Sequence, residues 1–454
     1  MSDFEWLKKT FEENDAGFQY MIDKKGHVAY SIHNQDILEK VKVAETPTEC
    51  TRLLHEWLSF FRSGHIGIES LGNEQQFLKM DQKTGIWNGN ISEFEKIVAS
   101  KKEVDYEGIW ETGEYKIGIK KEGSIFIGFI IESDVDGWRD QGRIKLKIEQ
   151  NKNNWKSTYY MRDYSIEERE NPELTGNNYL QIGQWLLKRI SPVFPEDQLV
   201  DKHFERMNAL VPYLEKLNKK TLYMRIPSFH HNAKFAIDNV LAANKEMILN
   251  TENLIIDIRN GTGGSDISYF ELLPFIYTNP MREVSVEFLS TERNNKRMLD
   301  LANNPEYRDI FDEVTRQQFK KDYERMQGEL GKFVNLSDKE VDIIQFDTIY
   351  AYPKNIGIII NGRNASTDEN FLLVAKQSKK VKLFGVTTFG SLDVSNMYYV
   401  DSPSKNFRLH YCLSRSLRIP GMEIDEIGIQ PDYYLDKSIP SYKWVDFVND
   451  ILNK

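Results

Sequence analysis

The sequence predicts an α/β protein, because strand-like apolar runs alternate with helix-like runs over the second half of its 454 residues. Alternation of this kind is typical of a sheet with helices packed on its faces. A chain of this length also exceeds one compact core, which favours two or three domains. We place the α/β core at 221–440, interrupted by a charged helical insertion at 290–345. The expected strands are 221–227, 254–260, 356–360 and 381–386, and the expected helices are 235–249, 267–277 and 370–378.

Three further segments are expected before this core. Residues 1–75 carry apolar positions at helical spacing, which predicts an N-terminal helical region with a short segment at 27–30 open to strand pairing. Residues 100–165 alternate apolar and polar positions between Gly, Asp and Asn turns, which predicts a small inserted antiparallel β domain. Residues 170–220 return to helical spacing and are expected to form a helical bridge to the core.

Composition and charge exclude several classes of protein. The net charge of −10 repels polyphosphate, so nucleic acid is not an expected partner. Only Cys50 and Cys412 are present, too few for a zinc site or a disulfide framework, although one bridge between them stays open. No run approaches the about 18 apolar residues of a membrane span. The chain opens without the apolar region of an export signal, and since a processed protein would look the same, the compartment stays open.

The most informative stretch is NGRNASTDENF at 361–371, which follows the expected strand 356–360. Ser366 stands directly before the expected helix, where free backbone N–H groups and the positive end of the helix dipole gather. A serine nucleophile needs such a place, because its oxyanion must meet hydrogen-bond donors. An N-cap with Glu369 at the capping-box position explains the same residues, and the local sequence alone favours the cap.

A second junction is the Gly-rich loop DIRNGTGGS at 257–265, between an expected strand and an expected helix. It lacks the Lys-Ser/Thr of a P-loop and the spacing of a dinucleotide fingerprint, which disfavours phosphate binding. Its glycines permit close approach of the backbone to a ligand and can aim an N–H at a developing negative charge. A tight turn that only requires positive φ explains the glycines as well when the loop is taken in isolation.

Four motifs taken together resemble peptidase family S41, the tail-specific protease and tricorn core group. They are LIIDIRNGTGGSD, IGIIINGRNASTDENF, VKLFGVTTFG and DEIGIQPDYYL, in the family's order over about residues 221–436. The resemblance implies a ClpP/crotonase-like core and a serine peptidase acting on peptides or unfolded proteins, with Ser366 as nucleophile. It further implies oxyanion donors at Gly263 or Gly264 and at Thr367, and no metal or organic cofactor.

A departure from the family pattern decides which general base is implied. Tail-specific members carry a Lys directly after the Phe-Gly that ends VKLFGVTTFG, and here Ser391 stands at that position. The tricorn-like branch takes its base from a His far upstream, which implies His65 at the end of an N-terminal helix. A neutral imidazole is suited to take the Ser366 proton and return it to the leaving amine.

The resemblance also implies a carboxylate that orients His65, near the closing strand. Alignment on the last motif puts Asp425 where related sequences usually carry Glu. Because Asp is one methylene shorter, Glu423 and Glu426 remain alternatives. The tricorn-like branch has a Ser directly before its His, and this chain has Gly64 there.

Other interpretations stay open. The departures at Gly64 and Asp425 would weaken proton transfer by His65, and they also fit a catalytically weakened binding protein for a peptide or hydrophobic ligand. A crotonase-like core also fits an acyl-CoA enzyme, although the negative net charge disfavours that class. The pair His230 and His231 is expected to be structural, since adjacent rings rarely hold one ion without a third ligand. The resemblance implies a periplasmic or extracellular location, and the oligomeric state is not indicated.

Overall fold

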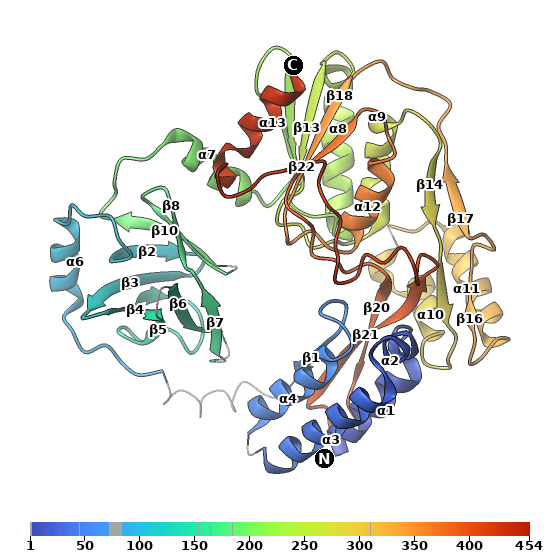
Figure 1. Cartoon of the computed structure of the whole chain (residues 1–454), viewed down its shortest axis with the longest axis horizontal. Coiled ribbons are helices and arrows are strands. Elements are labelled where there is room, and N and C mark those ends of the chain that lie inside the picture. The colour runs from blue at the N-terminus through green and yellow to red at the C-terminus, as the bar shows by residue number, and fades with distance from the viewer. Residues whose placement is uncertain are drawn as a thin grey trace. The chain divides into compact units, whose positions relative to one another are not determined.

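The computed structural model describes residues 2–44, 46–71, 84–151, 154–162, 164, 166–183, 185–308 and 310–454. They form two compact units, one made of Met1–Leu71 with Glu205–Lys454 and the other of Gly72–Phe204. The first unit holds the N-terminal helices, drawn in blue in Figure 1, and the α/β core, drawn in green to red. The boundaries expected at residues 75 and 165 lie outside the described residues.

A six-stranded sheet forms the centre of the first unit, in the order β11-β12-β13-β18-β19-β22. Every neighbouring pair from β12 to β22 is parallel, and β11 runs antiparallel to β12. This sheet confirms the predicted α/β class. The strands are β11 (Tyr213–Lys216), β12 (Thr221–Arg225), β13 (Asn253–Asp257), β18 (Asn355–Ile360), β19 (Val381–Gly385) and β22 (Tyr433–Tyr434).

Side chains on both faces of this sheet are buried. Ile256 and Ile358 pack with α8, α9 and α12 on one face, whereas Ile255 and Ile359 pack with α13 on the other. Figure 1 shows α8 and α12 on one side of β13 and β18, and α13 on the opposite side. Burial of both faces explains why these strands read as unbroken apolar runs. The helices are α8 (Lys234–Ile248), α9 (Leu273–Ile276), α12 (Thr367–Ala375), α13 (Trp444–Leu452) and the 3₁₀ helices His231–Ala233, Asp266–Leu272 and Ser441–Lys443.

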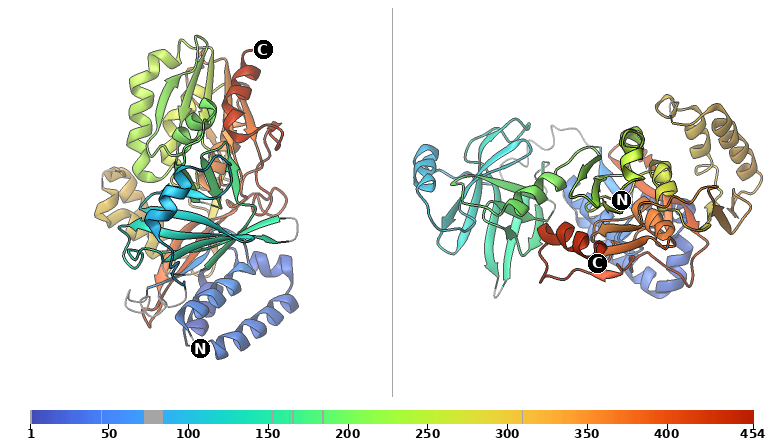
Figure 2. Two further views of the ribbon diagram at one scale, coloured as in Figure 1. Left: turned by 90° about the vertical axis from the view of Figure 1, so that its left-hand side faces the viewer. Right: turned by 90° about the horizontal axis from the view of Figure 1, so that it is seen from above.

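A second sheet of the first unit carries the N-terminal helices. Its order is β1-β21-β15-β16, and β20 pairs with β21. Phe11, Trp57 and Phe61 of the helical region pack in one cluster with Leu409 and Tyr411 of β21, and Figure 2 shows the blue helices beside these strands. The elements are α1 (Ser2–Asn14), α2 (Phe18–Lys25), α3 (His27–Val43), α4 (Pro47–Ser59), β1 (Gly67–Ser70), β15 (Val286–Leu289), β16 (Phe333–Val334), β20 (Val394–Asp401) and β21 (Phe407–Ser416).

The segment 27–30, for which strand pairing was open, lies in helix α3 instead. Tyr30, Ile37 and Val41 form the buried face of that helix, so the helical period continues through the segment. Its short apolar run alone does not show this period, because only the later turns of α3 complete it.

The charged segment 290–345 is helical in part. Met298, Met326 and Val334 form a small core of their own within it. The segment therefore has its own apolar contacts in addition to its charged surface. Its elements and the neighbouring strand are β14 (Met281–Val284), α10 (Lys296–Asn303), the 3₁₀ helix Pro305–Tyr307, α11 (Glu313–Gln327) and β17 (Val341–Ile344), with β14 and β17 paired antiparallel.

The second unit is a nine-stranded antiparallel sheet in the order β7-β6-β5-β4-β3-β2-β10-β9-β8. A core that includes Trp110, Trp138 and Leu146 is buried within this unit. Its elements are α6 (Ile91–Ala99), β2 (Gly108–Thr112), β3 (Tyr115–Glu122), β4 (Ile125–Ser133), β5 (Ile144–Asn151), β6 (Asn154–Tyr160), β7 (Ile166–Glu170), β8 (Glu173–Thr175), β9 (Tyr179–Ile182) and β10 (Trp185–Ser191).

The helical bridge expected over 170–220 is wrong for most of its length. Strands β8, β9 and β10 occupy its first part, and helix α7 covers only Gln198–Met207. Leu180 of β9 pairs with Leu187 of β10 across the sheet, and both are fully buried. Short apolar runs fit a helix or a strand equally. The pairing of β10 with β9 and with the distant β2, which decides between them, is not visible in the local pattern.

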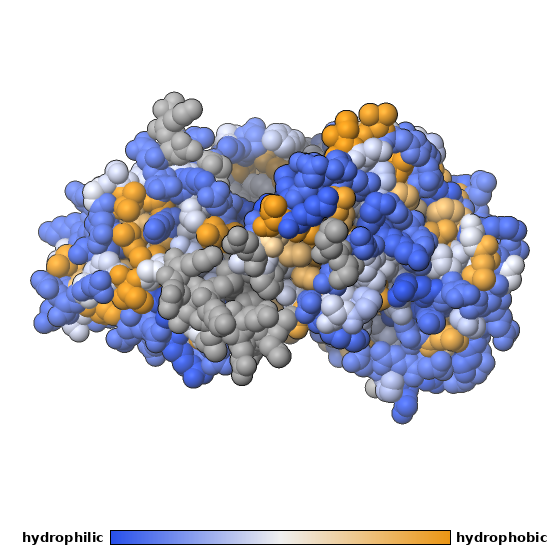
Figure 3. Space-filling view, turned by 90° about the horizontal axis from the view of Figure 1, so that it is seen from below, coloured by the Kyte–Doolittle hydropathy of each residue, from blue (hydrophilic) through white to orange (hydrophobic). Residues whose placement is uncertain are grey.

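The face of the molecule seen in Figure 3 is mostly hydrophilic, with small separate hydrophobic patches. This surface agrees with the mean hydropathy of −0.54 and the net charge of −10. None of the helices within the described ranges is long and apolar enough to cross a membrane.

Candidate active site

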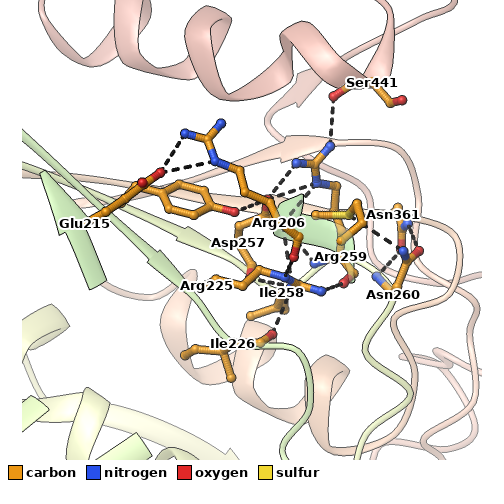
Figure 4. Close-up of polar contacts among 12 residues, drawn as sticks. Arg206, Glu215, Arg225, Ile226, Asp257, Ile258, Arg259, Asn260, Asn361 and Ser441 are labelled. Carbon is orange, nitrogen blue, oxygen red and sulfur yellow. Dashed lines mark hydrogen bonds and ion pairs between the residues drawn. The ribbon is translucent and has the colours of Figure 1, made fainter. Parts of the chain in front are cut away.

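Below the Gly-rich loop lies a buried polar cluster at the carboxyl end of β13. Arg259 donates to both carboxylate oxygens of Asp257, at 2.6 Å from Nη2 to Oδ2. Tyr223 donates to the same carboxylate at 2.9 Å, and Arg225 donates to the carbonyls of Asp257 and Arg259 at 2.8 Å each. Figure 4 shows Arg225 and Arg259 converging on this strand end. Burial alone would raise the pKa of Asp257, but the two guanidinium groups hold that pKa well below its usual value.

The cluster fixes the start of the Gly-rich loop, and asparagines join that loop to the one before α12. The Asn361 side chain accepts from the Asn260 N–H at 3.1 Å and donates to the Asn260 side chain at 2.8 Å (Figure 4). Asn364 donates to the carbonyl of Ile258 at 2.7 Å. The two junctions that the sequence singled out therefore lie side by side at the end of β13 and β18.

Ser366 occupies the N-cap of α12 with φ of 58° and ψ of −123°. Residues other than glycine rarely adopt a positive φ, and at a strand-to-helix turn such strain is common for a nucleophile. The Ser366 N–H donates to the carbonyl of Ser391 at 2.9 Å and contacts the carboxylate of Glu369 at 3.3 Å. Glu369 also accepts from the N–H groups of Gly390 and Ser391 at 2.8 Å each. Glu369 thus anchors the loop after β19 to the start of α12.

Two of the expected oxyanion residues, Gly263 and Thr367, lie beside Ser366. A Cβ built on Gly263 would lie 2.6 Å from the Ser366 Cβ and 3.0 Å from the Thr367 nitrogen, so only glycine permits this approach. The Gly263 N–H lies near the buried carboxyl of Asp368 and opposes the rise that burial causes in the pKa of that carboxyl. Within the described residues, the N–H groups of Gly264 and Thr367 have no hydrogen-bond acceptor. These two N–H groups are therefore available to an incoming acceptor, and that of Thr367 belongs to the residue directly after Ser366.

His65 lies between α4 and β1, with φ of 57°. Its carbonyl oxygen accepts from Arg62 at 3.1 Å and from the Cys412 thiol at 3.2 Å. Asp15 binds Arg62 through two hydrogen bonds of 2.8 and 2.6 Å and accepts from the Cys412 N–H at 3.0 Å. A buried ion pair from the N-terminal region therefore holds the backbone of His65 in its strained conformation.

The His65 ring bonds a backbone group. Its Nδ1 lies 2.7 Å from the carbonyl oxygen of Val394, the first residue of β20. Since a carbonyl only accepts, Nδ1 carries the proton and Nε2 of the neutral ring is unprotonated. Burial, together with the positive charge of Arg62, lowers the pKa of His65 to about 4 against the opposing effect of the hydrogen bond to Val394. The ring is therefore neutral over most of the pH range.

Ser391 brings the two expected catalytic segments together. Its carbonyl accepts from the Ser366 N–H. A Cβ built on Gly64, the residue before His65, would lie 2.7 Å from the Ser391 Cβ and closer still to its hydroxyl oxygen. The Ser391 side chain thus occupies the space that a side chain at position 64 would need. Ser391 itself is buried, at 4% exposure.

The three candidate carboxylates make different contacts. Asp425 accepts from the N–H groups of Leu392 and Asp393 at 2.5 and 2.7 Å and does not hydrogen-bond the His65 ring. Glu423 accepts from Tyr20 at 3.0 Å, and Glu426 accepts from the Ser63 N–H at 2.8 Å.

The structure thus places Gly263 beside Ser366 and Thr367, and Ser391 contacts both Ser366 and the residue before His65. Asp425 contacts the backbone of residues 392–394 and not the His65 ring. Sequence reasoning missed Val394 as the partner of the ring, since a main-chain carbonyl has no signature in residue type. Burial raises the pKa of Asp425 to about 6, and the neighbouring carboxylate of Asp393 adds to that effect.

The pair His230 and His231 takes no part in this arrangement. The His230 ring contacts Asn232 at 3.1 Å, and the His230 and His231 rings are tilted by 43° with their centroids 4.1 Å apart. Over the described residues, no cluster of three or more His, Cys, Asp or Glu side chains could hold a metal ion.

A cavity of about 350 Å³ opens beside α12. It is lined by apolar residues of that helix and by Arg418, Glu423 and Ile424. Asn370, also in its lining, lies one helical turn after Ser366 and donates to Glu283 at 2.6 Å. The cavity is therefore close in the fold to the proposed nucleophile.

The chain is similar to known peptidases in sequence and in fold. The sequence model of peptidase family S41 matches residues 220–435, and no curated protein matches the chain. The structure of mature CPAF complexed with lactacystin is 14% identical, with 99% of this chain and 96% of that chain covered and a TM-score of 0.53. Mature CPAF alone is 13% identical, with 99% and 95% covered and a TM-score of 0.52. At such identity the likeness to CPAF is one of fold.

Proposed function

Residues 220–435 form a domain of peptidase family S41, which makes the chain a serine-type peptidase, and from that premise we propose that it cleaves peptide bonds through an acyl-enzyme on Ser366. Its substrates are peptides or unfolded proteins. His65 acts as general base and then general acid, and Asp425 supports it through the backbone.

One observation carries this proposal. The Ser366 N–H donates to Ser391, and Gly64, the residue before His65, packs against the Ser391 side chain. The segments that carry the proposed nucleophile and the proposed base, far apart in the sequence, thus contact the same residue. The strained backbone of Ser366 adds support, because such strain is a cost that a plain helix cap does not require.

The reaction divides into two transfers. The Ser366 hydroxyl gives its proton to Nε2 of His65 as its oxygen attacks the substrate carbonyl carbon. The tetrahedral oxyanion accepts hydrogen bonds from the Gly264 and Thr367 N–H groups. The imidazolium then protonates the leaving amine, and the C–N bond breaks. Water hydrolyses the Ser366 ester in the second half of the reaction, with His65 again as the base. A bound extended peptide adds backbone hydrogen bonds as a further strand.

Of the two glycines that the resemblance implied, we assign the oxyanion role to Gly264. The Gly263 N–H lies near the Asp368 carboxyl, and the absence of a side chain at Gly263 keeps the loop close to Ser366. Gly264 lies against the backbone of Phe229, where an added Cβ would clash.

The test is reaction with a fluorophosphonate probe, followed by turnover of casein and a peptide library. Wild type should be labelled and should cleave, and Ser366→Ala should do neither. Lactacystin, the compound in the CPAF complex, should compete with the probe. Stoichiometric peptide binding without labelling or turnover would instead support the second candidate, a catalytically weakened binding protein, which the missing contact between Asp425 and the His65 ring favours.

A further inference from the structure

We propose that Asp393 and Arg418 are positioning residues for His65, and that the main-chain carbonyl of Val394 serves where a triad carboxylate would stand. The proposal rests on the proposed function, because it concerns the base of the same site. Neither Asp393 nor Arg418 belongs to a motif that the sequence singled out.

The first step is the bond from the ring. Val394 is 1% exposed and accepts from His65 Nδ1 at 2.7 Å. In a Ser-His-Asp triad the carboxylate holds the tautomer with Nδ1 protonated and fixes the ring plane. A carbonyl oxygen can perform both tasks, provided that its peptide plane does not turn. The position of this carbonyl therefore depends on the contacts that hold the backbone around Val394.

Two aspartates hold that segment reciprocally. The Asp425 carboxylate accepts from the N–H groups of Leu392, Asp393 and Val394 at 2.5, 2.7 and 3.4 Å. The Asp393 carboxylate accepts from the N–H groups of Ile424 and Asp425 at 2.5 and 2.8 Å. Each side chain therefore caps the backbone of the other segment. We call Asp393 and Asp425 the aspartate clamp.

Arg418 compensates the cost of burying the two carboxyl groups of the aspartate clamp. Two carboxylates this close repel each other, and burial without a cation is costly for both. Arg418 donates from Nε and Nη2 to Asp393 Oδ1 at 3.2 and 3.1 Å, with side-chain exposures of 8% and 1% for the pair. It thereby places a cation beside the Asp393 carboxylate, both oxygens of which accept hydrogen bonds. The Ser416 N–H adds a bond of 2.7 Å to the Asp393 carbonyl.

The aspartate clamp also explains why Asp425 stays in the site without touching the ring. The Asp425 carboxylate fixes the backbone up to Val394 through three N–H groups. It therefore acts on His65 only through the position of Val394, whose carbonyl accepts from the ring. A backbone carbonyl has no side chain to exchange, so its position can be adjusted only through residues such as Asp393. Loss of indirect support of this kind typically costs about 10- to 100-fold in activity.

The experiment compares wild type with Asp393→Asn and Arg418→Gln, using a peptide substrate and ¹⁵N-labelled histidine. We expect kcat to fall about 10- to 100-fold with KM unchanged, and the His65 Nδ1–H resonance to shift or to broaden by exchange with water. Arg418→Lys keeps the charge and should recover part of the lost kcat. Asp322→Asn, a buried Asp-to-Asn change in α11 where Gln318 is the partner, should leave kcat and the resonance unchanged.

The two proposals fail in different ways. If wild type neither cleaves nor reacts with the fluorophosphonate, the proposed function fails, and the resonance still tests the aspartate clamp because it needs no turnover. If wild type is active and Asp393→Asn and Arg418→Gln keep both the wild-type kcat and the wild-type Nδ1–H resonance, the positioning role is overturned. Should Asp393→Asn not fold, the Arg418→Lys and Arg418→Gln pair carries the same comparison.

Discussion

The N–H of Ser366 donates a 2.9 Å hydrogen bond to the carbonyl oxygen of Ser391. Ser391 stands two residues before Asp393, and its side chain packs against Gly64. One short loop after β19 therefore contacts the proposed nucleophile, the segment of the proposed base and the aspartate clamp. Glu369 anchors that loop through its backbone N–H groups. The relative position of the catalytic groups therefore depends on this loop more than on any direct contact between them.

Gly64→Ala should lower kcat/KM by about 100-fold, because a misplacement of about 1 Å at a catalytic group costs that much. The added methyl would lie 2.7 Å from the Ser391 Cβ and must move either Ser391 or the His65 segment. Ser391→Gly in the same chain should restore much of the loss by removing the clash. Gly67→Ala is the matched control, since a Cβ there meets nothing within 4 Å. A double variant no better than Gly64→Ala would contradict this packing.

Ser366→Gly should be more stable than Ser366→Ala, although both should be inactive. At φ of 58° and ψ of −123° a residue with a Cβ is strained, which costs about 1–3 kcal/mol, and only glycine relieves it. The larger unfolded-state entropy of glycine offsets about 0.5–1 kcal/mol of that gain. Urea denaturation of the two variants measures the difference. Equal midpoints would mean that the nucleophile turn stores no strain.

His65 should make the stability of the protein fall in mild acid. Its folded pKa of about 4 lies below the unfolded value of 6.5, so the unfolded chain binds the proton more tightly. The contribution is fully present above pH 6.5 and is lost as the pH falls from 6.5 toward 4. The stability difference between wild type and His65→Gln, measured by urea denaturation across this window, should shrink with falling pH. A difference independent of pH would show that the ring is not buried as described.

Arg62→Met should destabilise the protein by about 3–5 kcal/mol, because it leaves the buried carboxylate of Asp15 without its partner. Arg62 and Asp15 have side-chain exposures of 3% and 0%. Activity should fall as well, since Arg62 also holds the His65 carbonyl. Arg52→Met is the control, as its ion pair with Glu56 is exposed on α4 and should contribute less than about 1 kcal/mol. Thermal unfolding and peptide turnover of both variants provide the comparison.

The sequence predicted the core because its local patterns and its global fold agree. The strands β12, β13, β18 and β19 are apolar runs buried on both faces, and the junctions at Gly263 and Ser366 follow two adjacent parallel strands. The carboxyl ends of such strands meet at one edge, so the two junctions had to lie together. The position of His65 was expected only from the family resemblance.

The rest depends on contacts that residue type does not encode. The acceptor of the His65 ring is a backbone carbonyl, and the aspartate clamp acts on backbone N–H groups, so neither Val394 nor Asp393 stands out in the sequence. The wrong helical prediction near Leu180 and Leu187 has a similar cause, since only pairing across the sheet shows that both lie in strands.

His65 and β1 precede their partner strands β20 and β21 by more than 300 residues in the chain, which matters while the protein is being synthesised. The first unit is assembled from Met1–Leu71 and Glu205–Lys454, and β1, which follows His65, pairs with β21. While the polypeptide is still emerging from the ribosome, the imidazole exists long before the strand that anchors it has been translated. A nascent chain therefore cannot pair β1 with β21, or form the bond from His65 to Val394, until residues 394–416 have been translated.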